Sequence, residues 1–148
     1  MEQDKELAQA ILAQAGDAII FSDTEGTIRI WNAAAARIFG FAAEEALGKN
    51  LDLIIPEHLR PAHWAAFGHA VESGTERLGG RPTMTRGLHK SGQRLYVEMS
   101  FAVVRAGSGA VAGAVAVARD ATARYEEEKA RRGQSESARR TGGTAAGA

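Results

Sequence analysis

The sequence predicts an α+β fold, in which a five-stranded antiparallel sheet carries a helical insert on one face and is flanked by N- and C-terminal helices. Three observations predict it. Two segments with strand character come early in the chain and three come late, short helical segments separate the two groups, and polar helix-forming segments stand at both ends. A sheet assembled from both groups of strands can bury its apolar face under the helices between them.

Five strands are predicted from runs of β-branched and aromatic residues that are bounded by turn residues. The early pair is joined by the turn D-T-E-G, and the late strands are joined by K-S-G-Q and R-A-G-S-G. Such short connections are typical of hairpins, so the strands they join run antiparallel. The predicted strands are residues 17–23, 27–32, 83–89, 94–104 and 110–120.

Three helical segments separate the two groups of strands. Asn32 is a candidate N-cap for the first, and Gly40 ends it. A short helical turn follows over residues 41–48. A longer helix is predicted from about Glu57 to Ser73. Together these segments form the predicted insert on one face of the sheet.

Helices are also predicted at both ends of the chain. Leu7, Ile11 and Leu12 give the first a thin apolar stripe, which needs a partner in its own domain or in a second copy. The last helix is strongly charged, and the segment after it has no large apolar residue, so that segment is predicted to be disordered. The predicted organisation is a flanking helix at 1–15, a globular domain at 16–122, a helix at 123–132 and a disordered tail or linker at 133–148.

Composition argues against several classes of function. The 148 residues suit one domain, and the lack of cysteine excludes disulfides, thiolate chemistry and flavin–cysteine photochemistry. The 18 basic residues balance 18 acidic ones, which does not favour a nucleic-acid or membrane partner. An acidic N-terminus and the lack of a long apolar run indicate a cytoplasmic location. No phosphate loop, metal pair or nucleophile–base spacing is evident, so an enzyme is not expected.

Four motifs, in the same order and at similar spacing, resemble those of the PAS domain family. The resemblance covers about Ile11 to Thr122, which is most of the predicted ordered chain. The motifs are W-N-A-A-A-A-R-I-F-G-F at 31–41, E-E-A-L-G-K-N at 44–50, H-K-S-G-Q-R-L-Y-V-E at 89–98 and V-A-R-D-A-T at 117–122.

The resemblance implies a sensory or interaction module in signal transduction rather than an enzyme. It implies a homodimer formed through the flanking helices, residues 3–15 and 120–132. It also implies that a signal leaves the domain through Asp120, Thr122 and the helix after them, toward an output domain or a kinase. PAS domains bind haem, a flavin, a small metabolite or nothing, and the fold alone does not choose among these.

His63 is the candidate ligand to a metal. Residues three and four apart share a helix face, so His63 falls with Leu59, Phe67 and Ala70 on the apolar side of the predicted 57–73 helix. The segment P-E-H-L-R-P-A-H resembles the P-E-x-x-R-x-x-H segment of haem-PAS oxygen-sensor kinases, in which the histidine at this position is the proximal iron ligand. That resemblance implies haem b on His63 and a diatomic gas as the signal.

The remaining candidate cofactor-binding residues come from the same helix and from the late strands. Met99 and Phe101 share one face of the fourth strand, and the resemblance places them on the distal side of the haem. The other candidates are Phe67, Met84 as a core residue or a second iron ligand, and Val115 and Val117 from the last strand.

Other interpretations of the same residues stay open. His63 could be a core histidine that is hydrogen-bonded to a backbone carbonyl. The domain could be a cofactor-free dimerisation and protein-interaction module of a sensor kinase or transcription regulator. A third alternative is a flavin-binding redox PAS domain, for which no polar partner of the flavin ring is identified in the sequence.

Overall fold

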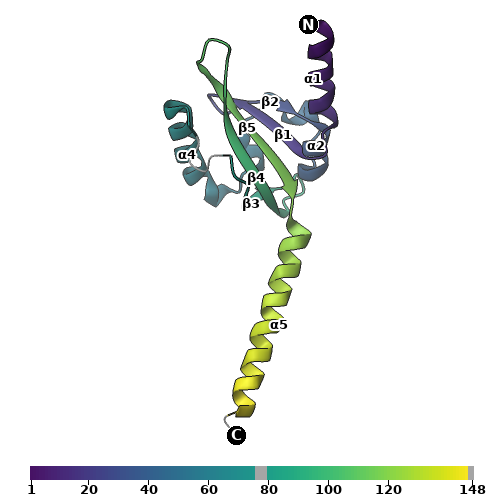
Figure 1. Ribbon diagram of the computed structural model, residues 1–148, viewed down its shortest axis with the longest axis vertical. Coiled ribbons are helices and arrows are strands. Elements are labelled where there is room, and N and C mark those ends of the chain that lie inside the picture. Colours follow the sequence, from purple (N-terminus) through teal and green to yellow (C-terminus); the bar gives the residue numbers. More distant parts are fainter. Residues whose placement is uncertain (76–79, 147–148) are drawn as a thin grey trace.

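The computed structural model describes residues 1–75 and 80–146 and has the predicted α+β architecture (Figure 1). Five strands form one sheet, and helices stand before, within and after it. The elements are α1 (Glu2–Gln14), β1 (Ala18–Asp23), β2 (Ile28–Trp31), α2 (Ala33–Phe39), α3 (Ala43–Ala46), the 3₁₀ helices η1 (Leu51–Ile54) and η2 (Glu57–Leu59), α4 (Arg60–Ser73), β3 (Thr83–Leu88), β4 (Arg94–Arg105), β5 (Val111–Asp120) and α5 (Thr122–Ala146).

The sheet has the order β2-β1-β5-β4-β3, and all of its neighbours run antiparallel. The last strand, β5, therefore lies in the centre between the early hairpin and the late one. Ala116 of β5 is opposite Ile20 of β1 on one side and Phe101 of β4 on the other. Side chains that are opposite one another in a sheet point to the same face, so these three residues share the face that packs on the insert.

The core lies between the sheet and the first helices of the insert. Phe39 at the end of α2 is fully buried, as are Ile28 and Val97 from the sheet. Asn32 caps α2 by accepting a hydrogen bond from the backbone N–H of Ala35, and Gly40 ends the helix in the left-handed conformation. Both of these helix ends were predicted from the sequence.

The longer insert helix, α4, stands apart from the sheet at the side of the molecule (Figure 1). It starts at Arg60, after the 3₁₀ turn η2, whereas one helix was predicted from Glu57. Pro61 lies at its first turn, as expected for a residue without a backbone N–H. Phe67 and Ala70 of α4 are buried, and the Phe67 ring contacts Phe101 of β4 with centroids 6.4 Å apart.

The prediction of a disordered tail at 133–148 differs from the structure, in which α5 continues as helix from Thr122 to Ala146. Residues 147 and 148 of the predicted tail lie outside the described part of the chain. The prediction rested on the absence of large apolar residues after residue 132. That composition rules out packing onto a core but not a charged helix that projects into solvent. Arg131 and Arg132 stand one turn after Glu127 and Glu128, with N–O distances of 3.9 Å in both pairs, and such pairs support an exposed helix.

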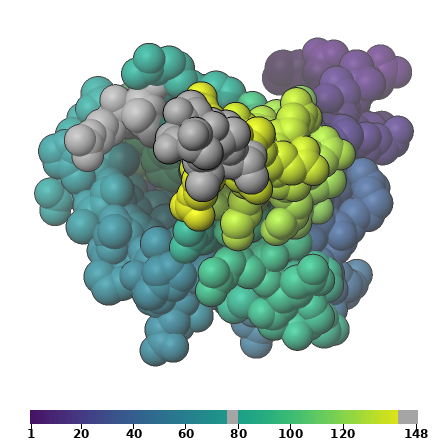
Figure 2. All heavy atoms as spheres, turned by 90° about the horizontal axis from the view of Figure 1, so that it is seen from below, coloured from purple at the N-terminus to yellow at the C-terminus, as the bar shows by residue number. Residues whose placement is uncertain are grey.

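The two end helices leave the domain in different directions. Figure 1 shows α1 beside α2 at one end and α5 projecting far from the other, and in Figure 2 the yellow-green α5 stands in front of the domain with the teal insert to one side. Within residues 1–75 and 80–146, no helix has the combined length and apolarity that a membrane crossing requires.

Candidate functional site

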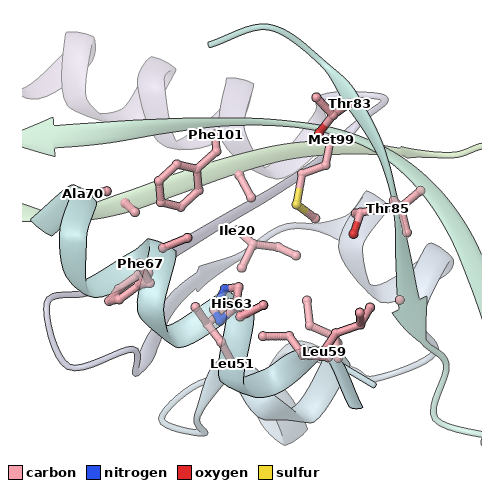
Figure 3. Close-up of a pocket in the computed structure, with 18 of the residues that line it drawn as sticks. Ile20, Leu51, Leu59, His63, Phe67, Ala70, Thr83, Thr85, Met99 and Phe101 are labelled. Carbon is pink, nitrogen blue, oxygen red and sulfur yellow. The ribbon is translucent and has the colours of Figure 1, made fainter. Parts of the chain in front are cut away.

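A cavity of about 920 Å³ lies between α4 and the sheet (Figure 3). Its volume is in the range of small-molecule and cofactor sites. Most of its lining is apolar, and the described lining residues include several polar or basic ones and no acidic one. The lining comprises Ile20, Ser22, Phe39, Leu51, Ile54, Ile55, Leu59, Ala62, His63, Ala65, Ala66, Phe67, His69, Ala70, Thr75, Arg81, Thr83, Thr85, Arg86, Gly87, Val97, Met99, Phe101, Ala114 and Ala116.

His63 lies in the wall that α4 contributes, and its ring faces the cavity (Figure 3). Its Nδ1 atom is buried and makes no hydrogen bond to the described residues. Burial lowers the pKa of His63 below its ordinary value, and the nearby carboxylate of Asp52 opposes that effect. The lowered pKa favours the neutral imidazole, which is the form that ligates metals. The alternative of a core histidine bonded to a backbone carbonyl has no support, since no such bond is made to the described residues.

Three of the other predicted cofactor-binding residues meet His63 at this cavity. Phe67 follows it by one turn of α4, and the two rings stack with centroids 5.9 Å apart. Met99 and Phe101 face them from β4 across the cavity (Figure 3). Phe67 and Phe101 also contact each other edge to face, with centroids 6.4 Å apart. The helix periodicity and the strand alternation thus place these four residues at one site.

Met84 was predicted to bind the cofactor, but the structure places it outside the cavity. It is 42 % exposed and does not line the cavity. Thr83 and Thr85, its neighbours in β3, occupy the inward positions. Met84 is opposite Glu98 on the outer face of the sheet, where it borders a shallow groove beside Tyr125. A strand alternates its faces, so a residue between two inward threonines points away from the cavity.

Val115 and Val117 were also predicted to bind the cofactor, and they too lie outside the cavity. The cavity is lined by Ala114 and Ala116 of β5, and Val117 is 37 % exposed on the opposite face. The prediction took the bulky residues of this strand to be the inward ones. In the structure the alanines point inward instead. Larger side chains at positions 114 and 116 of this central strand would fill the space that forms the cavity.

The sequence did not predict a role for Asp52, and Arg86 was not among the predicted cofactor-binding residues. Asp52 lies in the 3₁₀ turn η1 and accepts a hydrogen bond from the Trp64 indole nitrogen at 2.7 Å. Arg86 lines both the cavity and the outer groove, and its guanidinium lies over the Tyr96 ring, 5.8 Å from the centroid. The sequence has no periodic signal for these residues, because one contact joins a 3₁₀ turn to α4 and the other joins two neighbouring strands.

The predicted signalling residues form a compact junction at the start of α5. Thr122 receives a hydrogen bond from the Tyr96 N–H at 3.1 Å, and its own N–H and hydroxyl donate to the Asp120 carboxylate at 2.9 and 2.6 Å. The rings of Tyr96 and Tyr125 stack with centroids 3.6 Å apart. Since Tyr96 lies in β4 beside the cavity residue Val97, this strand contacts both the cavity and the first turns of α5.

Comparison with known proteins identifies the family. A family model described as the PAS fold matches residues 6–121, so the chain belongs to the PAS family and is a PAS sensory domain. The chain is 28% identical over 103 residues to the oxygen sensor protein DosP of Escherichia coli (strain K12), in an alignment that covers 70% of this chain and 12% of that protein.

Two further similarities agree with this assignment. The sensor protein FixL of Bradyrhizobium diazoefficiens is 26% identical over 99 residues, which cover 67% of this chain and 20% of FixL. The chain thus spans only a small part of the length of both relatives. The crystal structure of a PAS domain from Colwellia psychrerythraea superposes with a TM-score of 0.70 at 23% identity, covering 80% of this chain and 98% of that one.

Proposed function

We propose that this PAS domain senses a small ligand in the cavity between α4 and the sheet, through haem b bound by His63. The observation that carries the proposal is the position of His63: its imidazole faces a large, mostly apolar cavity from the wall that α4 contributes (Figure 3). A lone histidine suits haem better than a bare metal ion. A bare ion needs several protein ligands, and the described residues hold no group of three His, Asp or Glu that could supply them.

The cavity residues fit a haem group. His63 would hold the iron, and Met99, Phe101 and Ala116 would form the apolar wall on the other side. His69 is exposed and lines the cavity, so its ring can donate a hydrogen bond to a carboxylate of haem b. Haem supplies reversible binding of a diatomic gas, and the apolar surroundings of the site tune that binding.

The relatives and the local motif support this ligand. One relative is by name an oxygen sensor, and both are sensor proteins. The segment Pro56–His63 matches the haem-PAS pattern P-E-x-x-R-x-x-H, and Pro56 is buried in the turn that leads into α4. Flavin has less support, because the deep part of the cavity offers Ser22 as its one buried polar side chain among the described residues.

The proposed relay passes through β4 and the start of α5. A shift of β4 caused by ligand binding in the cavity would move Tyr96. Tyr96 contacts Thr122 and Tyr125 at the start of α5. Arg124 of α5 is also bound to Glu98 of β4, with an N–O distance of 2.6 Å. We propose that α5 carries the signal to an output domain or a kinase and that the domain itself is not catalytic.

His63→Ala is expected to abolish specific haem binding. Wild-type protein supplied with haem should show a sharp Soret band that shifts with carbon monoxide, and the variant should lose this band or bind at least about tenfold more weakly. His58→Ala, at an exposed histidine of the 3₁₀ turn η2 that does not line the cavity, is the matched control and should keep the band. A wild-type protein without a Soret band, or a band that His63→Ala leaves unchanged, would contradict the haem proposal and favour a cofactor-free module.

We also propose that the domain forms a homodimer through α1 and α5. Leu7 and Ile11 are each 60% exposed on α1, which has no buried residue of its own. Their apolar stripe therefore has no partner within the described chain, and a second copy would supply one.

Light scattering tests the dimer. The wild type is expected at twice the chain mass of 15.6 kDa, and the double variant Leu7→Glu, Ile11→Glu is expected to shift to the single-chain mass. Leu47→Glu, at an exposed leucine on the insert, should leave the dimer intact. A wild type that already has the single-chain mass would refute the proposal.

A further inference from the structure

We propose that Asp52 and Trp64 act together as positioning residues that hold the His63 ring toward the cavity, and this inference rests on the proposed function. A metal-ligating histidine is usually oriented by a hydrogen bond from its second nitrogen to a carboxylate or carbonyl. Within residues 1–75 and 80–146, the His63 Nδ1 atom has no such partner. Its orientation must therefore come from packing.

The packing around His63 is aromatic on two sides. The Trp64 ring meets it edge to face, with centroids 4.7 Å apart and planes at 83°. Phe67 stacks against it, and Trp64 and Phe67 contact each other with centroids 5.2 Å apart. The three rings thus form one cluster, and a rotation of the imidazole requires Trp64 or Phe67 to move.

Residues outside α4 contact both ends of the Trp64 indole and fix its position. The Nε1 atom donates to the Asp52 carboxylate at 2.7 Å. The opposite edge of the ring lies on the backbone at Gly26, in the turn between β1 and β2, where an added Cβ would be 2.3 Å from a ring carbon. This close approach is possible because Gly26 has no side chain.

Asp52 is held in place by its own contacts. Its N–H donates to the Asn50 side chain at 2.8 Å, and its carbonyl accepts from the Arg60 guanidinium at 3.2 Å. Arg60 also approaches the Asp52 carboxylate at 3.8 Å and donates to the Ile55 carbonyl. The 3₁₀ turn that carries Asp52 is therefore joined to the first turn of α4, on which His63 lies.

The Trp64 indole donates its hydrogen bond to a carboxylate that is accessible to solvent, since the Asp52 side chain is 40% exposed. Substitution at this position leaves no large cavity, so Asp52→Ala is expected to fold. Asp52→Asn keeps an oxygen that can accept the indole hydrogen bond, while it removes the charge. The pair of variants therefore separates the hydrogen bond from the charge.

The test compares wild type, Asp52→Ala, Asp52→Asn and Trp64→Leu by two measurements. The first is NMR of the histidine ring protons in the haem-free protein, with the His63 signals identified by their loss in His63→Ala. The second is haem affinity from the Soret titration. Asp52→Ala and Trp64→Leu should move the His63 ring signals toward those of an unrestrained ring and weaken haem binding by about tenfold. Asp52→Asn should stay close to wild type in both measurements.

Two results would overturn the inference. One is an Asp52→Ala protein with wild-type His63 signals and wild-type haem affinity. The other is an Asp52→Asn protein that changes as much as Asp52→Ala, which would assign the effect to charge rather than to the indole hydrogen bond. Failure of the proposed function itself appears differently: the wild type would bind no haem, while the ring signals of the haem-free variants would still show whether Asp52 and Trp64 hold His63.

Discussion

Asn32→Ala is expected to lower the free energy of unfolding by about 3–5 kcal/mol, because each buried polar group that loses its partner costs roughly 1–3 kcal/mol. The Asn32 side chain is 5% exposed and makes four hydrogen bonds. Its oxygen accepts from the N–H groups of Ile19 and Ala35, both at 3.0 Å, and its nitrogen donates to the carbonyls of Leu12 and Asp17 at 2.9 and 3.0 Å. It therefore joins the end of α1, the first strand and the start of α2.

Urea unfolding of Asn32→Ala and Asn50→Ala measures this difference. Asn50 is also a helix cap, but it is exposed and accepts one hydrogen bond, from the Asp52 N–H. Its substitution is expected to cost about 1 kcal/mol, which is typical for the loss of a cap. Equal losses in the two variants would show that the three longer-range bonds of Asn32 contribute nothing to stability.

Asn32 also shows how far the sequence could predict this fold. The local pattern identified it as a cap, and the bond to the Ala35 N–H confirms that role. The other three bonds go to residues 13 to 20 positions away, namely Leu12 in α1, Asp17 in the connection after it and Ile19 in β1. No local pattern contains those partners, because they are set by how the first helix enters the domain.

The sequence predicted the candidate site correctly where the larger side chains of a strand are the ones that face the cavity. In β4 the alternation of bulky residues placed Met99 and Phe101 correctly in the cavity. In β5 the same rule failed, since Ala114 and Ala116 face inward and Val115 and Val117 face outward. A binding cavity needs small residues on part of its wall. The assumption that the larger residues of a strand point inward therefore fails for a strand that forms such a part of the wall.

The surroundings of His63 show the same limit. Helical spacing predicted that His63 points inward, and it does. The residues that hold its ring could not be predicted, because Gly26 and Asp52 reach Trp64 from a hairpin turn and a 3₁₀ turn that are distant in the chain. Predicting such contacts requires the three-dimensional position of the turns and not only their existence.

Gly113→Ala is expected to destabilise the protein by at least about 3 kcal/mol, at the upper end of the cost of overpacking. A Cβ at Gly113 would lie 1.9 Å from the Ser22 carbonyl oxygen and 2.9 Å from the Asp23 Cα. Both atoms belong to the backbone of β1, which pairs with β5 through Asp23 and Gly113. A side-chain rotation cannot relieve such a contact, so the two central strands would have to separate locally.

Gly107→Ala is the matched control, since a Cβ there would have no atom within 4 Å, and its free energy of unfolding should stay within about 0.5 kcal/mol of wild type. Because β1 also brings Ile20 and Ser22 into the cavity, separation of β1 from β5 changes the cavity wall together with the sheet. Gly113→Ala should therefore also weaken haem binding, whereas Gly107→Ala should not. A Gly113→Ala protein as stable as wild type would mean that β1 and β5 can move apart at low cost, which would contradict a rigid wall on this side of the cavity.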